Sequence, residues 1–193
     1  MRTAEITRET KETTISCRLD LDGSGNAEIR TGIGFLDHML ELLAFHSGMD
    51  LRLNADGDLD VDDHHTVEDC GIVLGTAFRK ALGDRRGINR YGFFTLPMDE
   101  SLAESVIDIS GRPYLVFQGE FRREMIGLLA TEMIEEFLRA FAVSAGVTLH
   151  VRILYGSNDH HKAEAVFKSL GRALRQAVNV NGDQIPSTKG SLE

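Results

Sequence analysis

The second half of this chain repeats the first. The segment HHTVEDCGIVLGTAFRKAL at 64–82 aligns without a gap with HHKAEAVFKSLGRALRQAV at 160–178, and eight of the 19 positions are identical. Two sequences of average composition would share about one. The general similarity of amphipathic helices explains shared Leu and Ala, but it does not explain two His and one Glu in register. We therefore infer a tandem duplication.

Apolar spacing predicts strands and two helices in each half. Residues 13–21 alternate and are rich in β-branched side chains, which is typical of a strand, and a second strand at 26–31 would complete a hairpin. Residues 33–47 and 64–82 carry apolar side chains at helical spacing, and a glycine follows each segment. The same order of elements starts again after residue 90.

These elements predict an α+β fold. Each half would contain a roughly four-stranded sheet with two helices layered on it, and a pseudo-twofold axis would relate the halves. We place the first half at 1–90 and the second at 91–178, as parts of one compact unit. The segment 179–193 is polar and interrupted by Gly and Pro, and we expect it to be a mobile tail.

Composition narrows the range of partners. The 193 residues include 21 Lys and Arg against 30 Asp and Glu, a net charge of −9, so we expect no nucleic acid partner. No run approaches the ~18 apolar residues of a membrane span, and the N-terminus lacks an apolar signal core. We therefore expect no membrane partner and a cytoplasmic location. Two cysteines, Cys17 and Cys70, do not make a disulfide framework.

The duplicated His-His-x-x-Glu segments indicate metal binding. His64 and Glu68 are four residues apart and share one helix face, whereas the next side chain, His65, is rotated by ~100°. One ion would therefore not bind both adjacent imidazoles. Each helix would instead serve two ions, and symmetry groups the donors as His64, Glu68 and His161 at one ion and His160, Glu164 and His65 at the other.

The first helix of each half offers a further ligand. Aligning Gly48 with Gly146 places His38 of the first half opposite Glu136 of the second, and both are ligand types. Imidazole and carboxylate donors without thiolate suit Mn, Fe, Co or Zn, and a mixed set with open positions favours a six-coordinate ion such as Mn²⁺. A lone His-Glu pair on a helix is usually a surface pair, but the repeat in register favours ligation.

Eight short segments, in order along nearly the whole chain, resemble those of the imidazoleglycerol-phosphate dehydratase family of histidine biosynthesis. They are TKET at 10–13, GFLDHML at 34–40, DDHHTVED at 62–69, LPMDES at 96–101, DISGRPYL at 108–115, TEMIEEF at 131–137, NDHHKAEAVFKSLGRALRQ at 158–176 and IPSTKG at 185–190. The resemblance implies conversion of imidazole glycerol phosphate to imidazole acetol phosphate and water through a metal-bound imidazolate. It also implies two Mn²⁺ per active site and a homo-oligomer, a 24-mer with active sites at subunit interfaces.

The resemblance also assigns roles to residues. One ion would be bound by His38, His65, His160 and Glu164, and the other by His64, Glu68, Glu136 and His161, and these side chains would surround the substrate. Several relatives have His at position 136, so Glu136 departs from their pattern. Glu12 would contact the substrate and, with Glu164, transfer protons. The phosphate would be bound by Arg90, Arg112, Lys168, Ser187 and Lys189.

Two other functions remain open on the residues alone. A two-metal hydrolase acting on a phosphoester or an amide would hold its ions ~3.5–4 Å apart across a bridging oxygen. A metal-storage or metal-stabilised assembly protein would need no set of cations ready for a phosphate. An imidazole or triazole phosphonate should raise the melting temperature only of a dehydratase.

Overall fold

The first half of the chain forms one four-stranded sheet and two helices. The computed structural model describes residues 1–192. The strands lie in the order β1-β2-β4-β3, and only the β3–β4 pair is parallel. The elements are β1 (Thr3–Glu9), β2 (Thr13–Asp20), β3 (Ala27–Arg30), α1 (Gly34–Ser47), β4 (Asp50–Gly57) and α2 (His64–Leu82).

The second half has the same topology. Its sheet has the order β5-β6-β10-β7, and again only the last pair is parallel. A short two-stranded sheet, β8 with β9, is added before the third helix. The elements are β5 (Tyr91–Met98), β6 (Ser101–Asp108), β7 (Tyr114–Gln118), β8 (Met125–Ile126), β9 (Leu129–Ala130), α3 (Glu132–Ala145), β10 (Thr148–Tyr155) and α4 (Asp159–Val178). The duplication and the α+β class are thereby confirmed.

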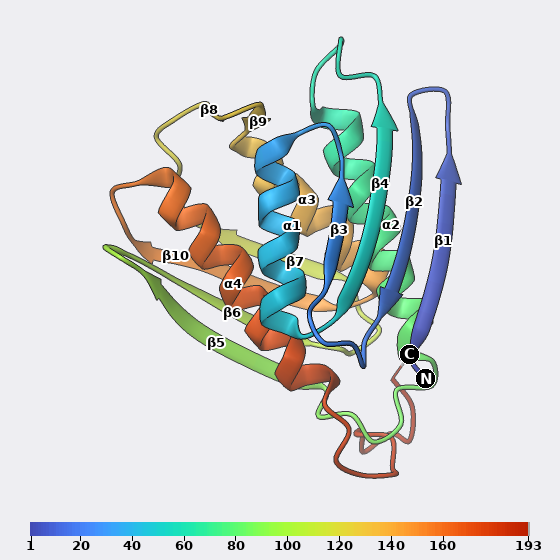
Figure 1. Ribbon diagram of the computed structural model, residues 1–193. Coiled ribbons are helices and arrows are strands. Elements are labelled where there is room, and N and C mark those ends of the chain that lie inside the picture. Colours follow the sequence, from blue (N-terminus) through green and yellow to red (C-terminus); the bar gives the residue numbers. More distant parts are fainter. Residues whose placement is uncertain (193) are drawn as a thin grey trace.

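The four helices lie between the two sheets (Figure 1). Helix α2 packs on β1 and β2, and α4 packs on the equivalent strands β5 and β6. Across the middle of the molecule, α2 packs against α3 of the other half, and α1 packs against α4. Each His-His-x-x-Glu helix is therefore paired with the first helix of the opposite half.

Two equivalent glycines permit these helix crossings. A Cβ built on Gly75 of α2 would lie 2.6 Å from the carbonyl oxygen of Phe141 in α3, and one on Gly171 of α4 would lie 3.0 Å from that of Leu43 in α1. Both distances are shorter than ordinary carbon–oxygen contacts, so only glycine lets the backbones approach this closely. The two glycines are among the eight identical positions of the repeat.

The expected hairpin between residues 13–21 and 26–31 does not form. Strand β2 pairs instead with β1, and β3 crosses beyond β4 and pairs with it in parallel. Strand β1 has little apolar character apart from Ala4 and Ile6, so its sequence gives a weak strand signal. The turn after β2 is held by Asp50, whose Oδ1 accepts hydrogen bonds from the backbone of Ser24 and Asn26.

The C-terminal segment folds back on the connection between the halves. Val180 forms an isolated bridge with Ile88, the backbone N–H of Gly87 donates to Gln184, and Arg85 donates to the carbonyl oxygen of Leu192. These contacts place residues 180–192 beside the loop that enters β5. None of the helices formed by residues 1–192 combines the length and the apolar character needed to cross a membrane.

Candidate active site

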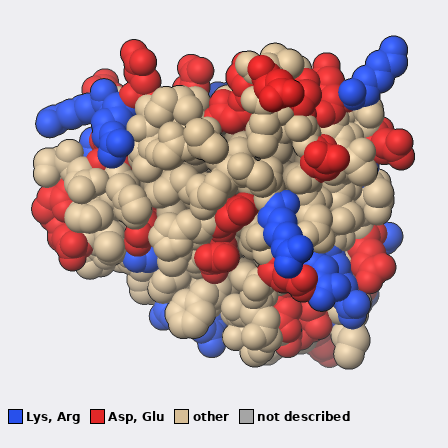
Figure 2. Space-filling model, turned by 45° about the horizontal axis from the view of Figure 1, so that its top comes forward, with Lys and Arg blue, Asp and Glu red and all other residues tan. Residues whose placement is uncertain are grey.

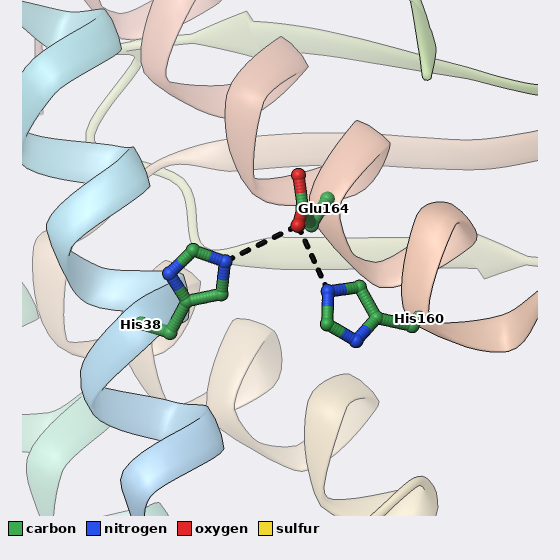
Figure 3. A group of neighbouring side chains, drawn as sticks. All are labelled: His38, His160 and Glu164. Carbon is green, nitrogen blue, oxygen red and sulfur yellow. Dashed lines mark hydrogen bonds and ion pairs between the residues drawn. The ribbon is translucent and has the colours of Figure 1, made fainter. Parts of the chain in front are cut away.

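Two imidazoles and a carboxylate meet where α1 packs against the start of α4 (Figure 3). His38 Nε2 lies 3.2 Å from Glu164 Oε1, and His160 Nε2 lies 2.9 Å from the same oxygen. One donor atom from each residue lies within 4.8 Å of the other two. Glu164 is buried, and the two histidines are half-buried.

Local structure places these side chains. Helix α4 begins after Asn158, whose side-chain oxygen accepts hydrogen bonds from the backbone N–H groups of His160 and His161. This cap fixes the first turn, so His160 and Glu164, four residues apart, share one face. His38 lies in the second turn of α1, which packs against α4.

The surroundings of Glu164 hold it in the ionised form. Burial alone would raise the pKa of this carboxyl, but hydrogen bonds from Lys168, His38 and His160 outweigh that effect and lower the pKa to about 2. The Lys168 Nζ lies 2.5 Å from Glu164 Oε2. Glu164 therefore offers a permanent negative charge between two imidazoles.

The donor set fits a divalent cation. Two imidazole nitrogens and one carboxylate oxygen, without thiolate, are ligands that Mn²⁺, Fe²⁺ and Zn²⁺ accept. Three protein donors leave positions open for a further ligand or for a substrate. Among residues 1–192, this is the one group of three or more such side chains whose donor atoms converge within 4.8 Å.

The second histidine of each pair points elsewhere. The rings of His64 and His65 have centroids 6.2 Å apart at an interplanar angle of 75°, and those of His160 and His161 are 6.1 Å apart at 86°. His65 and His161 do not join the cluster around Glu164 within the described part of this chain. In both halves the two adjacent imidazole rings therefore point in different directions, as a rotation of ~100° per helical residue predicts.

Each of these second histidines has a carboxylate partner. Nδ1 of His65 lies 3.0 Å from Asp58 Oδ2, and Nδ1 of His161 lies 2.7 Å from Glu100 Oε2. The hydrogen bond with Asp58 raises the pKa of His65, and that with Glu100 raises the pKa of His161. Glu12 approaches the other edge of the His65 ring, with its Oε1 3.9 Å from Nε2.

The remaining expected ligands lie around the start of α2. His64 is the first residue of that helix and is exposed, and Glu68 is half-buried one turn further on. Glu136 lies on α3, which packs against α2, and accepts from Arg139 Nε at 3.3 Å. The pseudo-twofold arrangement of helices makes this set the counterpart of His38, His160 and Glu164.

A separate group of cations lies beside the C-terminal segment. Arg90, Arg112, Ser187 and Lys189 line one surface pocket, together with Ser110 and Thr188. Arg90 is held by Asp108, at 2.7 Å from its Nε, and donates to the carbonyl oxygen of Pro186 at 3.0 Å. This contact places the Ser187 and Lys189 segment beside the two arginines.

The two groups lie at opposite ends of α4. The backbone N–H of Arg90 donates to the carbonyl oxygen of Ala177, near the end of that helix, whereas His160 and Glu164 lie at its start. At 1.5 Å per residue, roughly 20–25 Å separates them. Lys168 lies with Glu164 and not with the other expected phosphate-binding residues. Figure 2 turns the top of Figure 1 toward the viewer, and on this face the Lys and Arg side chains form small separate groups.

Asp58 was not expected at the site. It belongs to the acidic run DGDLDVDD, in which no single carboxylate stands out, and its proximity to His65 depends on how β4 ends. Glu100 could be found, because the repeat aligns it with Glu12.

Known proteins match this chain over nearly its full length. The family model described as imidazoleglycerol-phosphate dehydratase matches residues 31–174. Proteins of that name from Clostridium botulinum and Xanthobacter autotrophicus are 59% and 60% identical to it, over 99% and 100% of this chain and 98% and 99% of their own lengths.

Solved structures of proteins with the same name have a similar fold. The crystal structure of imidazoleglycerol-phosphate dehydratase from Staphylococcus aureus has a TM-score of 0.84 at 41% identity, and covers 93% of this chain and 99% of its own. The structure of the Pyrococcus furiosus protein in complex with (S)-C348 also has a TM-score of 0.84, at 37% identity, and covers 97% of this chain and 100% of its own. The chain therefore belongs to the imidazoleglycerol-phosphate dehydratase family, a family of lyases.

Proposed function

We propose that this enzyme removes water from imidazole glycerol phosphate to give imidazole acetol phosphate, a step of histidine biosynthesis, with two divalent cations, preferably Mn²⁺, in each active site. The observation that carries the metal requirement is the convergence of His38, His160 and Glu164 from two helices of opposite halves. Both imidazole nitrogens approach one carboxylate oxygen, and imidazole and carboxylate are ligands that such cations accept.

The reaction is difficult because the C–H bond to be broken has no neighbouring carbonyl group. The imidazole ring of the substrate is attached to the carbon that loses hydroxide, so electron density from the ring can expel that hydroxide. Bound cations would supply Lewis acidity and fix the ring in place. The residues of the chain then have three tasks: to hold the cations, to move the C–H proton, and to hold the phosphate.

The proposed ligands form two equivalent sets. His38, His160 and Glu164 would hold the first cation, with His65 as the fourth ligand. The second cation would be held by His64, Glu68, Glu136 and His161. Each set combines a helix pair with one second histidine, which is the arrangement that the duplication predicts.

Glu12 is the better candidate for proton transfer. Its side chain is 54% exposed, lies at the tip of the β1–β2 hairpin and faces Nε2 of His65. The resemblance assigns proton transfer to Glu164 as well, but a carboxyl with a pKa of about 2 is a weak base near neutral pH. The ionised state of Glu164 supports its role as a ligand.

The phosphate would be bound by Arg90, Arg112, Ser187 and Lys189. Two arginines and a lysine supply charge, and a guanidinium can bind two phosphate oxygens at once. In one chain this group lies roughly 20–25 Å from the proposed metal ligands, since the two lie at opposite ends of α4. A small imidazole phosphate cannot span that distance, so the separation supports an active site shared between chains in a homo-oligomer. The resemblance suggests 24 copies.

Metal removal and reconstitution test the proposal. Enzyme stripped with a chelator should not convert imidazole glycerol phosphate, and Mn²⁺ should restore formation of the acetol phosphate. Full turnover by metal-free protein would overturn the metal requirement. Release of inorganic phosphate from the same substrate would indicate the hydrolase alternative, and metal binding without either reaction would indicate storage.

A further inference from the structure

The two second histidines, His65 and His161, present the same edge of the ring to a carboxylate. In both, Nδ1 makes the hydrogen bond, to Asp58 at 3.0 Å and to Glu100 at 2.7 Å. An ionised carboxylate can only accept, so a neutral imidazole must carry its proton on Nδ1 and its lone pair on Nε2. His38 and His160 likewise direct Nε2 into the cluster. Nε2 of His65 and of His161 can therefore offer its lone pair to a cation directly, whereas Nε2 of His38 and of His160 donates to Glu164 in this structure and would have to lose its proton to bind one.

The Glu100 carboxylate and the Asp58 backbone are held in place by further hydrogen bonds. The Oε1 of Glu100 accepts from the backbone N–H of Asn158 at 2.7 Å and of Ser157 at 3.1 Å, which leaves Oε2 for His161. Asp58 directly follows β4, and its backbone N–H donates to the carbonyl oxygen of Glu12. A carboxylate whose oxygen or backbone is held in this way can orient the ring that it contacts.

The duplicated position at the hairpin tips has diverged. The repeat aligns Glu12, in the β1–β2 turn, with Glu100, in the β5–β6 turn. Glu100 contacts Nδ1 of its histidine, whereas Glu12 lies on the Nε2 side of His65. In the first half, Asp58 occupies the place at Nδ1 that Glu100 fills in the second. The Glu12 carboxylate makes no hydrogen bond with other side chains or backbone within residues 1–192.

We propose that Asp58 and Glu100 are positioning residues, which hold His65 and His161 with Nε2 directed to a divalent cation, and that Asp58 frees Glu12 to face the substrate. This inference rests on the proposed function, because it takes the two histidines to be metal ligands. It assigns different tasks to residues that the duplication made equivalent.

Asp58 gives the cleaner test, since replacing Glu100 would also release the Ser157–Asn158 turn. Asp58→Ala removes the acceptor, Asp58→Asn keeps an acceptor oxygen at the same place, and Asp60→Ala changes an exposed carboxylate of the same loop. The assembled enzyme is stripped of metal and titrated with Mn²⁺, and free Mn²⁺ is measured by electron paramagnetic resonance. Unfolding of the metal-free variants is measured in parallel.

Asp58→Ala should weaken Mn²⁺ binding 10–100-fold, as is typical for the loss of a carboxylate that orients a ligand. Asp58→Asn should recover most of the affinity, and Asp60→Ala should match the wild type. If Asp58→Ala and Asp60→Ala bind Mn²⁺ with equal affinity, the inference is overturned. This holds even if Asp58→Ala lowers the stability of the metal-free protein. If the wild-type enzyme itself binds no Mn²⁺, the proposed function is overturned as well. The wild-type titration therefore distinguishes failure of the proposed function from failure of this inference alone.

Discussion

His38 Nε2 lies 3.2 Å from Oε1 of Glu164, although the two residues are 126 positions apart in the sequence. This contact joins a helix of the first half to a helix of the second, and it defines the proposed metal centre.

Replacing His38 should remove one cation. His38→Ala leaves two of the three converging donors, so we expect the enzyme to lose one of the two Mn²⁺ ions of each site and most of its turnover. Metal analysis of the purified protein checks the first expectation and a dehydration assay checks the second. His150→Ala, at an exposed strand position, is the control. A His38→Ala enzyme with the full Mn²⁺ content would contradict the assignment.

Replacing Glu12 should separate chemistry from metal binding. Glu12→Gln keeps the shape of the side chain but removes the proton acceptor, so kcat should fall by about 10²–10⁴-fold. Mn²⁺ affinity should change little, because Glu12 is not among the proposed ligands. Steady-state kinetics and Mn²⁺ titration on the same preparation measure both. An unchanged kcat would exclude Glu12 from proton transfer.

Asp159 makes the stability of the chain sensitive to acid. It is buried against Lys162, with Oδ1 2.8 Å from Nζ, and Oδ2 accepts from two backbone N–H groups. Burial alone would raise the pKa of this carboxyl, but the hydrogen bonds from Lys162 and the backbone lower it below the ordinary 3.8. Its contribution to stability is therefore fully present above pH 3.8 and is lost as the pH falls through the lowered value.

Asp159→Asn should accordingly unfold with a weaker pH dependence than the wild type in this acidic range. Asp159→Ala, which leaves Lys162 buried without its partner, should cost about 3–5 kcal/mol near neutral pH. Urea unfolding of metal-free protein, at one protein concentration and several pH values, tests both expectations. If the free energies of unfolding of the wild type and of Asp159→Asn change in parallel with pH below pH 3.8, the expected weaker pH dependence is contradicted.

The glycines at the helix crossings should resist substitution. A methyl group at Gly75 would meet the carbonyl oxygen of Phe141, and one at Gly171 would meet Cβ of His46 at 2.9 Å. We expect Gly75→Ala and Gly171→Ala each to lower the free energy of unfolding by about 1–3 kcal/mol, the usual effect of overpacking. Gly34→Ala, where a Cβ meets nothing within 4 Å, is the control. Equal stability of all three variants would show that the crossings can relax.

The sequence predicts much of this fold because its strongest signals repeat. Two His, one Glu and the crossing glycine recur in register, and a shared register requires the same helix position in both halves. The same spacing predicts that His160 and Glu164 share a face. It does not predict how β3 pairs, because parallel pairing with β4 depends on contacts between distant segments.

The site is predictable only where the repeat or helical spacing constrains it. The alignment with Glu136 predicts His38 as a ligand, and the structure brings it to Glu164. Asp58 could not be found, since its contact with His65 depends on the path of a loop within an acidic run. The separation of Arg90 from Glu164 also depends on tertiary structure, because Glu164 lies near the start of α4 whereas Arg90 contacts the end of that helix from a distant segment.

Mixing two inactive variants tests the shared active site most directly. Glu164→Ala damages the proposed metal-binding group, and Arg112→Ala/Lys189→Ala damages the proposed phosphate-binding group. Suppose that each active site takes its metal-binding group from one chain and its phosphate-binding group from another. When the two variants are co-expressed in equal amounts, about a quarter of the sites in the mixed assemblies should then have both groups intact. The kcat/KM of the mixed assemblies should recover accordingly. Mixed assemblies no more active than the separate variants would contradict an active site built between chains.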